Sequence, residues 1–199
     1  MADIPAETVK ELRERTGAGF MDCKRALTEV DGDIDAAIVL LRERGLAAAA
    51  KKAGRDAREG LVSSYIHTGG RVGVLIEVNC ETDFVARTDE FQRLVRDLAV
   101  QVAGFSPKYV DIDRIPEADL VARQAELAAD ESVSRKPEHI RPQIVEGQLK
   151  KWYAQVCLYE QPFRDEERTV RELVNERIAT IGENIRIRRF VRYALGEEM

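Results

Sequence analysis

The feature that most constrains this chain is a change in the spacing of its apolar residues near residue 60. Before that point, apolar side chains recur every three or four positions, as in residues 34–41, which is the repeat of an amphipathic helix. After it, apolar side chains alternate with other residues, as in residues 72–78, which is the repeat of a β-strand. The change of period predicts an α+β protein whose helical and sheet-forming parts follow one another along the chain.

The first part predicts a bundle of three short helices over residues 1–45. Pro5 suits a first helical turn, Gly17 ends the first helix, and Asp33 is a suitable N-cap for the third, which we expect to end at Gly45. Residues 46–60 are rich in alanine and charge, which predicts a helical linker. The predicted domains are therefore residues 1–45, the linker 46–60 and an α+β core domain over residues 61–199.

The second part predicts a small antiparallel three-stranded sheet covered by helices. Two alternating runs flank the Gly-Gly turn of residues 67–71 and indicate a β-hairpin. A third strand is predicted near residues 185–190, with the alternation slipping at Arg189 and Phe190. A hairpin alone is unstable, so covering helices are expected. Helical spacing places them at residues 88–103, 117–129, 141–160 and 168–181.

Composition argues against several classes of protein. The 199 residues carry a formal net charge of −5, whereas general nucleic-acid binding needs a clustered basic surface. We found no sequence constellation typical of an enzyme active site, and we expect no enzymatic activity and no cofactor. The charged N-terminus lacks the apolar stretch of a signal peptide, and no apolar run is long enough to span a bilayer. We therefore expect a cytoplasmic protein without a membrane partner.

The cysteines and histidines are too dispersed to predict a metal site or a disulfide framework. Cys23, Cys80 and Cys157 are odd in number and form no CxxC motif, and His67 and His139 are isolated. We interpret the cysteines as buried or half-buried thiols of a reducing compartment.

Three segments leave a structural and a functional interpretation open. Gly17-Ala18-Gly19 opens a helix and could bind phosphate, but the absence of a nucleotide-binding fingerprint favours a simple turn. Thr82 and Asp83 resemble N-cap residues, which would leave Phe84 in the core; alternatively, an exposed turn displays Asp83 and Phe84 to a partner. The arginines of residues 185–193 suit either RNA or the solvated face of an edge strand, and the acidic chain favours the strand.

Four segments carry a specific resemblance. LRERTGAGFMDCKRAL (residues 12–27) and EVNCETDFVAR (residues 77–87) resemble the two signatures of the elongation factor Ts family. LYEQPFRDEERTV (residues 158–170) and IGENIRIRRF (residues 181–190) are similar to two further segments of that family. The matches follow the family's order and extend over almost the whole chain.

The resemblance implies a fold, a function and a set of site residues. The N-terminal bundle would resemble a ubiquitin-associated domain, and the chain would bind the GTPase elongation factor Tu, dislodge its Mg²⁺ and promote GDP release without catalysing a reaction. The implied exchange element, in which the resemblance favours the functional interpretation, is Thr82, Asp83, Phe84 and Val85. The implied N-terminal docking surface is Gly17, Gly19, Phe20, Met21 and Lys24, although Phe20 also fits the apolar stripe of its helix.

The chain also resembles the short form of the family, with one sheet-bearing module and no inserted helical hairpin. In that form two chains can pair, so we expect a homodimer through the core domain. Two other functions stay open at this point. A helical-bundle module could bind ubiquitin-like folds or nascent chains, and an RNA-binding protein could use Arg186, Arg188, Arg189 and Arg192.

Overall fold

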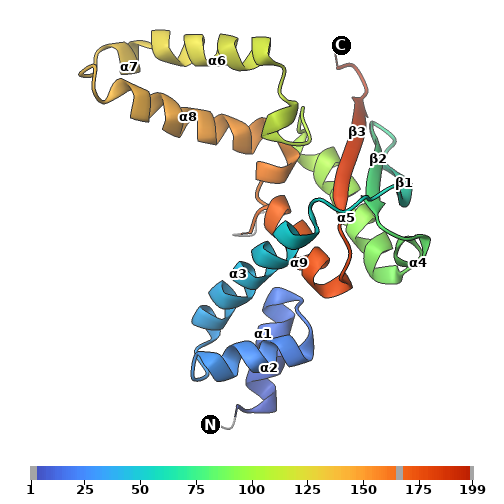
Figure 1. Ribbon diagram of the computed structural model, residues 1–199. Coiled ribbons are helices and arrows are strands. Elements are labelled where there is room, and N and C mark those ends of the chain that lie inside the picture. The colour runs from blue at the N-terminus through green and yellow to red at the C-terminus, as the bar shows by residue number, and fades with distance from the viewer. Residues whose placement is uncertain (1–3, 165–167, 198–199) are drawn as a thin grey trace. The chain divides into compact units, whose positions relative to one another are not determined.

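The computed structural model describes residues 4–164 and 168–197 and has an α+β fold (Figure 1). The predicted fold class is confirmed: helices come first, and a sheet then alternates with further helices. The helices are α1 (Ala6–Thr16), α2 (Phe20–Glu29), α3 (Ile34–Lys52), α4 (Asp83–Ala86), α5 (Asp89–Phe105), α6 (Glu117–Ala129), α7 (Glu131–Ser134), α8 (Arg141–Val156) and α9 (Val170–Ile181). The strands are β1 (Glu59–Ile66), β2 (Val72–Cys80) and β3 (Arg186–Ala194), and short 3-10 helices cover Ile112–Arg114 and Leu158–Glu160.

Helices α1, α2 and α3 form the predicted N-terminal bundle. Gly17 adopts φ 69°, and its N–H donates to the carbonyl of Arg13 at 2.8 Å, which ends α1 in the left-handed conformation that glycine permits. Asp33 caps α3, because its carboxylate accepts a hydrogen bond from the Ala36 N–H at 3.0 Å. The small core of the bundle consists of Val9, Leu12, Cys23, Ala26, Leu27 and Ala37.

The third helix is longer than predicted. It does not end at Gly45 but continues to Lys52 through the alanine-rich segment. A single glycine inside a helix costs about 1 kcal/mol relative to alanine, and the alanines that follow are the strongest helix formers, so the helix passes through it. The prediction that residues 1–45 and 61–199 are separate domains joined by a linker concerns independent folding, and it stays a prediction.

The described strands form one sheet in the order β1-β2-β3. The predicted hairpin is confirmed: His67 donates its N–H to the carbonyl of Val72 at 2.9 Å around the glycine-rich turn. The predicted third strand is also present, and the Leu195 N–H just beyond its end donates to the carbonyl of Arg71 at 2.8 Å. Burial along β3 changes phase after Ile187, because Arg188 and Arg189 are both exposed.

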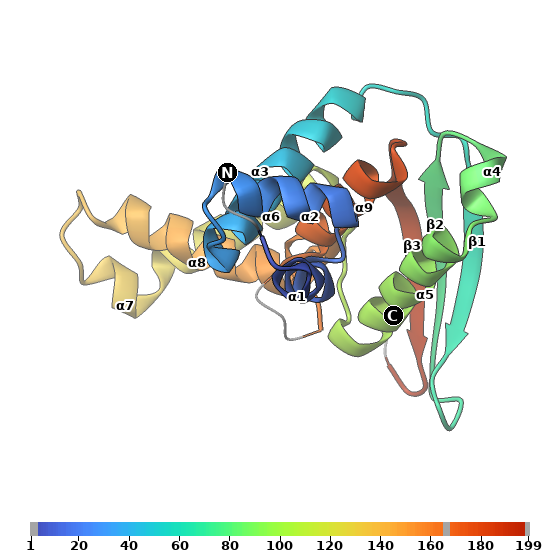
Figure 2. The same ribbon diagram turned by 90° about the horizontal axis from the view of Figure 1, so that it is seen from below.

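The two faces of the sheet differ in their environment. Helix α5 lies along one face (Figure 2), and its apolar stripe, including Phe91, Leu94 and Leu98, is buried as predicted. The other face carries exposed apolar side chains from each strand, and we call it the open face. Its exposed residues are Val62, Ile66, Leu75, Val191 and Tyr193.

A helical hairpin follows α5, contrary to the expectation that none is inserted. Helices α6 and α8 pack against each other and are joined through α7 (Figure 1). Leu127, Val133 and Leu149 are buried within this hairpin. The sequence had predicted helices at residues 117–129 and 141–160, and the second ends earlier, at Val156. Both helices were predicted from the sequence, but their packing against each other was not.

A buried polar network joins α5 to the segment after α8. Gln101 and Gln161 are each 1% exposed, and the Gln101 amide nitrogen donates to the Gln161 side-chain oxygen at 3.3 Å. The Gln161 amide nitrogen donates to the carbonyls of Phe105 at 3.2 Å and Gln155 at 3.0 Å. Since buried amides are costly when unpaired, these bonds explain how a glutamine is accommodated in the LYEQPF segment.

The chain divides into two compact units. The first comprises the residues up to Leu61, together with Val78–Gln92 and Arg171–Arg186. The second comprises Val62–Glu77, Arg93–Val170 and the residues from Ile187 onward. The first unit thus contains the N-terminal bundle, the segment after β2 and most of α9, which are far apart in sequence.

Gly60 in β1 is predicted to be intolerant of any side chain. Its φ is +136°, and a Cβ added there would lie 2.1 Å from the carbonyl oxygen of Val78. We expect Gly60→Ala to lower the free energy of unfolding by about 3 kcal/mol or more, because a strained backbone conformation and a backbone clash both contribute. Urea denaturation followed by circular dichroism measures this.

Gly69→Ala is the matched control. Gly69 also has a positive φ, +88°, but a Cβ there would meet no atom within 4 Å. We expect this variant to lose only about 1 to 2 kcal/mol. Equal losses at the two positions would contradict the clash.

Candidate functional site

The segment that follows β2 forms a short turn of helix. Thr82 is the N-cap of α4, as predicted, with its hydroxyl oxygen accepting from the Val85 N–H at 3.4 Å. Asp83 is not a cap but the first residue of α4, and its carboxylate accepts from the Arg87 guanidinium at 2.8 Å. Both groups of this ion pair are substantially exposed.

Phe84 projects from this turn into solvent and is 79% exposed. Its neighbours behave differently, since Val85 is half-buried and Ala86 is buried. The interpretation of Phe84 as a core residue is therefore wrong. Burying a phenylalanine completely is worth about 1.5 to 3 kcal/mol, so an exposed ring gives up a substantial contribution to stability. A partner that covers the ring would recover that contribution.

The turn is anchored by residues that follow α9. One carboxylate oxygen of Glu183 accepts hydrogen bonds from the N–H groups of Glu81 and Thr82, both at 3.0 Å. The other oxygen accepts from the Thr82 hydroxyl at 2.6 Å. In return, the Glu81 carboxylate accepts from the Asn184 N–H at 2.6 Å. Sequence analysis did not identify this pairing, because no local pattern indicates that residues 81 and 183 meet.

Cys80 lies directly beneath the turn. Its thiol is buried and donates to the carbonyl of Thr82 at 3.2 Å. Burial, and to a smaller extent the charge of Glu183, raises the pKa of Cys80 from 9.0 to about 11. Cys23 and Cys157 are also buried, as predicted.

The predicted N-terminal docking surface also reaches solvent. Phe20 is 46% exposed and Met21 62% exposed, and Lys24 is exposed beside them on α2. Phe20 therefore lies outside the core stripe that the sequence had assigned to it. Gly17 ends α1 and Gly19 is the N-cap residue of α2, so the two glycines set the direction from which α2 begins.

Helix α9 contacts the N-terminal bundle and the start of α5 within the first unit. The Arg177 guanidinium lies against Gly17, where an added Cβ would be 3.4 Å from its nitrogen, and it pairs with Glu90 at 3.3 Å. The Lys52 ammonium, at the C-terminal end of α3, donates to the carbonyl of Ile178 at 3.2 Å. The bundle and the start of α5, which follows the turn at residues 82–85, are thus both in contact with α9.

The described residues offer no obvious metal chemistry. Residues 4–164 and 168–197 contain no group of three or more His, Cys, Asp or Glu side chains placed to hold a metal ion. No helix in the same residues is long and apolar enough to cross a membrane. The candidate site consists of two surfaces with exposed apolar side chains, one on α2 and one on the turn at residues 82–85.

Comparison with known proteins decides the family. The model of the family described as elongation factor TS matches residues 6–197. The chain is 57% identical over 195 residues to elongation factor Ts of Thermoanaerobacter sp. strain X514, covering 98% of this chain and 96% of that protein. It is 55% identical over 199 residues to elongation factor Ts of Desulforamulus reducens, covering 99% of this chain and 91% of the relative. This chain belongs to the elongation factor Ts family. It is therefore a translation elongation factor.

The family match includes every candidate site residue. Residues 6–197 contain both the docking surface on α2 and the turn from Thr82 to Val85. The elongation factor Ts of Caldanaerobacter subterraneus subsp. tengcongensis is 56% identical over 195 residues, covering 98% of each chain. The resemblance noted from four segments thus extends over nearly the whole sequence.

The cysteines of this elongation factor Ts chain are predicted to react slowly in the folded state. All are buried, and the raised pKa of Cys80 keeps its thiol neutral. At pH 8 we expect the native chain to react with a thiol-specific disulfide reagent at least about 100-fold more slowly than the urea-unfolded chain. The time course of thiolate release measures this, and a native thiol that reacts at the unfolded rate would contradict it.

The same pKa shift gives a pH dependence with a definite sign. The fold favours the neutral thiol of Cys80, so its contribution to stability is complete below pH 9 and is lost as the pH rises from 9.0 to about 11. Replacing Cys80 with serine, which does not titrate in this range, should flatten that part of the stability profile.

Proposed function

We propose that this chain is a guanine nucleotide exchange factor of elongation factor Tu and that it acts in the cytoplasm without catalysing a reaction of its own. The observation that supports this most strongly is the exposure of Phe84 in a member of the elongation factor Ts family. Phe84 lies on a turn that is held by hydrogen bonds to Glu183. A bare aromatic ring beside a carboxylate is suited to enter a pocket of a partner protein. The proposal treats the nucleotide and its Mg²⁺ as belonging to the partner.

In the proposed mechanism, Phe84 acts as a wedge. GDP is held in a GTPase by phosphate-binding amides and by a Mg²⁺ that bridges phosphate and protein. The ring inserts between helices of the GTPase and displaces the elements that hold the ion. Once Mg²⁺ is lost, the repulsion between the phosphate charges is no longer compensated, and GDP binds more weakly.

Asp83 supports the wedge by changing polar contacts next to it. Its carboxylate is paired with Arg87 in the free chain, and exposed ion pairs of this kind contribute only about 0 to 1 kcal/mol. Exchanging Arg87 for a group on the partner therefore costs little. Thr82 and Val85 shape the turn, since they supply the cap and its hydrogen-bond donor.

Thermodynamic linkage requires a second contact. A factor that weakens GDP binding is itself weakened by GDP to the same extent, and each tenfold effect corresponds to about 1.4 kcal/mol. The factor must therefore bind the empty GTPase tightly. The surface formed by Gly17, Gly19, Phe20, Met21 and Lys24 supplies that affinity in our proposal. GTP then displaces the factor. GTP is selected over GDP because the cellular concentration of GTP is higher.

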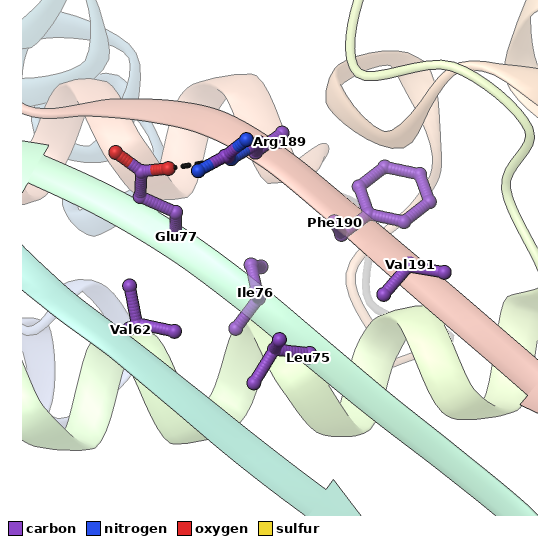
Figure 3. Close-up of a pocket in the computed structure, with 7 residues that line it drawn as sticks. All are labelled: Val62, Leu75, Ile76, Glu77, Arg189, Phe190 and Val191. Carbon is purple, nitrogen blue, oxygen red and sulfur yellow. Dashed lines mark hydrogen bonds and ion pairs between the residues drawn. The ribbon is translucent and has the colours of Figure 1, made fainter.

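We further propose that two chains pair through the open face of the sheet. Three exposed apolar side chains of that face, Val62, Leu75 and Val191, line a groove of about 350 Å³ (Figure 3). Its lining residues are Val62, Leu75, Ile76, Glu77, Arg189, Phe190 and Val191. Glu77 and Arg189 pair with each other at 2.7 Å, so the groove contains no unmatched charge from these two residues. Sheets commonly bury such a face by packing on a second sheet.

The structure weakens the case for RNA binding. The Arg192 guanidinium pairs with Glu197 at 2.8 Å and also donates to the carbonyl of Ala103 at 3.4 Å. Arg189 is engaged by Glu77. Two of the four arginines that suggested RNA are thus neutralised within the protein, on a chain whose net charge is −5.

GDP release tests the exchange function. We expect catalytic amounts of the chain to accelerate release of fluorescent GDP from elongation factor Tu, and Phe84→Ala to reduce that acceleration at least tenfold, or about 1.4 kcal/mol. Asp83→Ala should reduce it less. Because Phe84 is exposed, its removal should change the free energy of unfolding by no more than about 0.5 kcal/mol.

The matched control is Val121→Ala, since Val121 is 56% exposed on α6 and belongs to neither proposed surface. This variant should exchange at the unmodified rate. A folded Phe84→Ala chain with full activity would refute the site, and an unmodified chain that does not accelerate GDP release would refute the function.

Light scattering tests the dimer. At about 10 μM, well above the dissociation constant of a stable interface, we expect twice the 22.4 kDa mass of the chain. Val62→Glu combined with Tyr193→Glu places like charges on both copies and should give the monomer mass. Val121→Glu should remain dimeric. A monomer mass for the unmodified chain would rule out the dimer at this concentration.

A further inference from the structure

We propose that Glu183 is a positioning residue for nucleotide exchange, which holds the turn carrying Phe84 in the conformation that engages the partner. The inference rests on the proposed exchange function and adds a residue that lies about a hundred positions away in sequence. Glu183 itself is half-buried, whereas Phe84 is 79% exposed.

The hydrogen bonds of Glu183 all go to the two residues before α4. Its carboxylate accepts from the N–H groups of Glu81 and Thr82 at 3.0 Å and from the Thr82 hydroxyl at 2.6 Å. Such bonds are strengthened by the negative charge of the acceptor. They also satisfy two backbone donors that the end of β2 and the start of α4 leave free.

Glu183 also sets the orientation of the cap. The Thr82 hydroxyl donates its hydrogen to Glu183, which leaves an oxygen lone pair directed to the Val85 N–H at 3.4 Å. Without Glu183, that hydroxyl is free to rotate away. The carboxylate therefore controls both the backbone before Phe84 and the bond that spans it.

Two hydrogen bonds of the neighbouring Asn184 hold the segment that contains Glu183 in place. The Glu81 carboxylate accepts from the Asn184 N–H at 2.6 Å, and the Asn184 amide donates to the carbonyl of Arg55 at 2.8 Å. Asn184 is 4% exposed, so this connection is part of the packed structure. Hydrogen bonds therefore join residues 81–82 to residues 183–184 in both directions, and they restrain the turn that follows Thr82.

Phe84 needs such support because its own ring makes little contact with the chain. The position of an exposed side chain is set by its backbone, and a turn that frays must be ordered again when it binds. Ordering on binding lowers the fraction of encounters that reach the geometry needed to displace Mg²⁺. Glu183 is therefore expected to act on the maximal rate of exchange more than on affinity, since its hydrogen bonds go to Glu81 and Thr82 and not to the surface on α2 that supplies the affinity in our proposal.

The central experiment compares Glu183→Ala with Glu183→Gln. At saturating factor, we expect Glu183→Ala to lower the maximal rate of fluorescent GDP release from elongation factor Tu at least about tenfold, with a change of no more than about threefold in the half-saturating concentration. Glu183→Gln should stay within about threefold of the unmodified rate. The glutamine amide oxygen still accepts from both N–H groups, and its amide nitrogen donates to the hydroxyl oxygen of Thr82.

Combination with Phe84→Ala shows whether Glu183 acts through the ring. In that background, Glu183→Ala should change the rate less than about twofold, because residues that act through one another are not additive. Full additivity of the two substitutions would overturn the proposal, and so would equal losses in the alanine and glutamine variants.

Hydrogen exchange in the free chain gives a readout that needs no partner. In Glu183→Ala, the amides of Thr82 and Val85 should exchange faster, whereas the amides in the core of α5 should keep their protection. A Glu183→Ala chain that loses protection throughout, or fails to fold, would show a general structural role and overturn a local one.

These results separate the two proposals. If the unmodified chain does not accelerate GDP release, the exchange function fails, and hydrogen exchange still reports on the turn. If Phe84→Ala is inactive while Glu183→Ala exchanges at the unmodified maximal rate, only the role of Glu183 fails.

Discussion

The structure of the candidate site depends on a short set of hydrogen bonds between residues 81–82 and residues 183–184. They join the end of β2 to the start of β3, two places that are about a hundred residues apart in the chain. Because two carboxylates and two backbone segments satisfy one another, the turn keeps its shape without an apolar core beneath each side chain. That arrangement leaves Phe84 free to face solvent, which is the property that any role in binding requires.

Three of the surfaces that expose apolar side chains are the ones proposed to bind a partner, and each has a local support. Phe84 stands on the turn capped by Thr82, Met21 stands on α2 above the core of the bundle, and Val62 belongs to a sheet whose other face is covered by α5. Each exposed residue gives up free energy that burial would provide, and the network around it offsets that loss. An exposed apolar patch is a common feature of interaction surfaces, which is why the proposals place the partner there.

The predictions from sequence succeeded where spacing within one segment determines the structure. The stripe of α5, the hairpin around the Gly-Gly turn and the Asp33 cap were all predicted correctly. They failed where the structure depends on a segment far away in sequence, or on the helix propensity of the residues that follow. Gly45 was expected to end a helix that in fact continues, and the pairing of α6 with α8 was missed although both helices were predicted. The N-cap at Thr82 was predicted, but the carboxylate that orients its hydroxyl was not.

The sequence by itself determined most of the elements, because helix and strand periods are local properties, and it indicated the family, because four matching segments occur in order. Only the tertiary structure decided the environment of each aromatic ring. Phe84 and Phe91 lie seven positions apart in one motif-bearing stretch, yet Phe91 is fully buried and Phe84 is 79% exposed. The difference follows from which residues pack around each ring, and those residues come from parts of the chain that no local pattern connects.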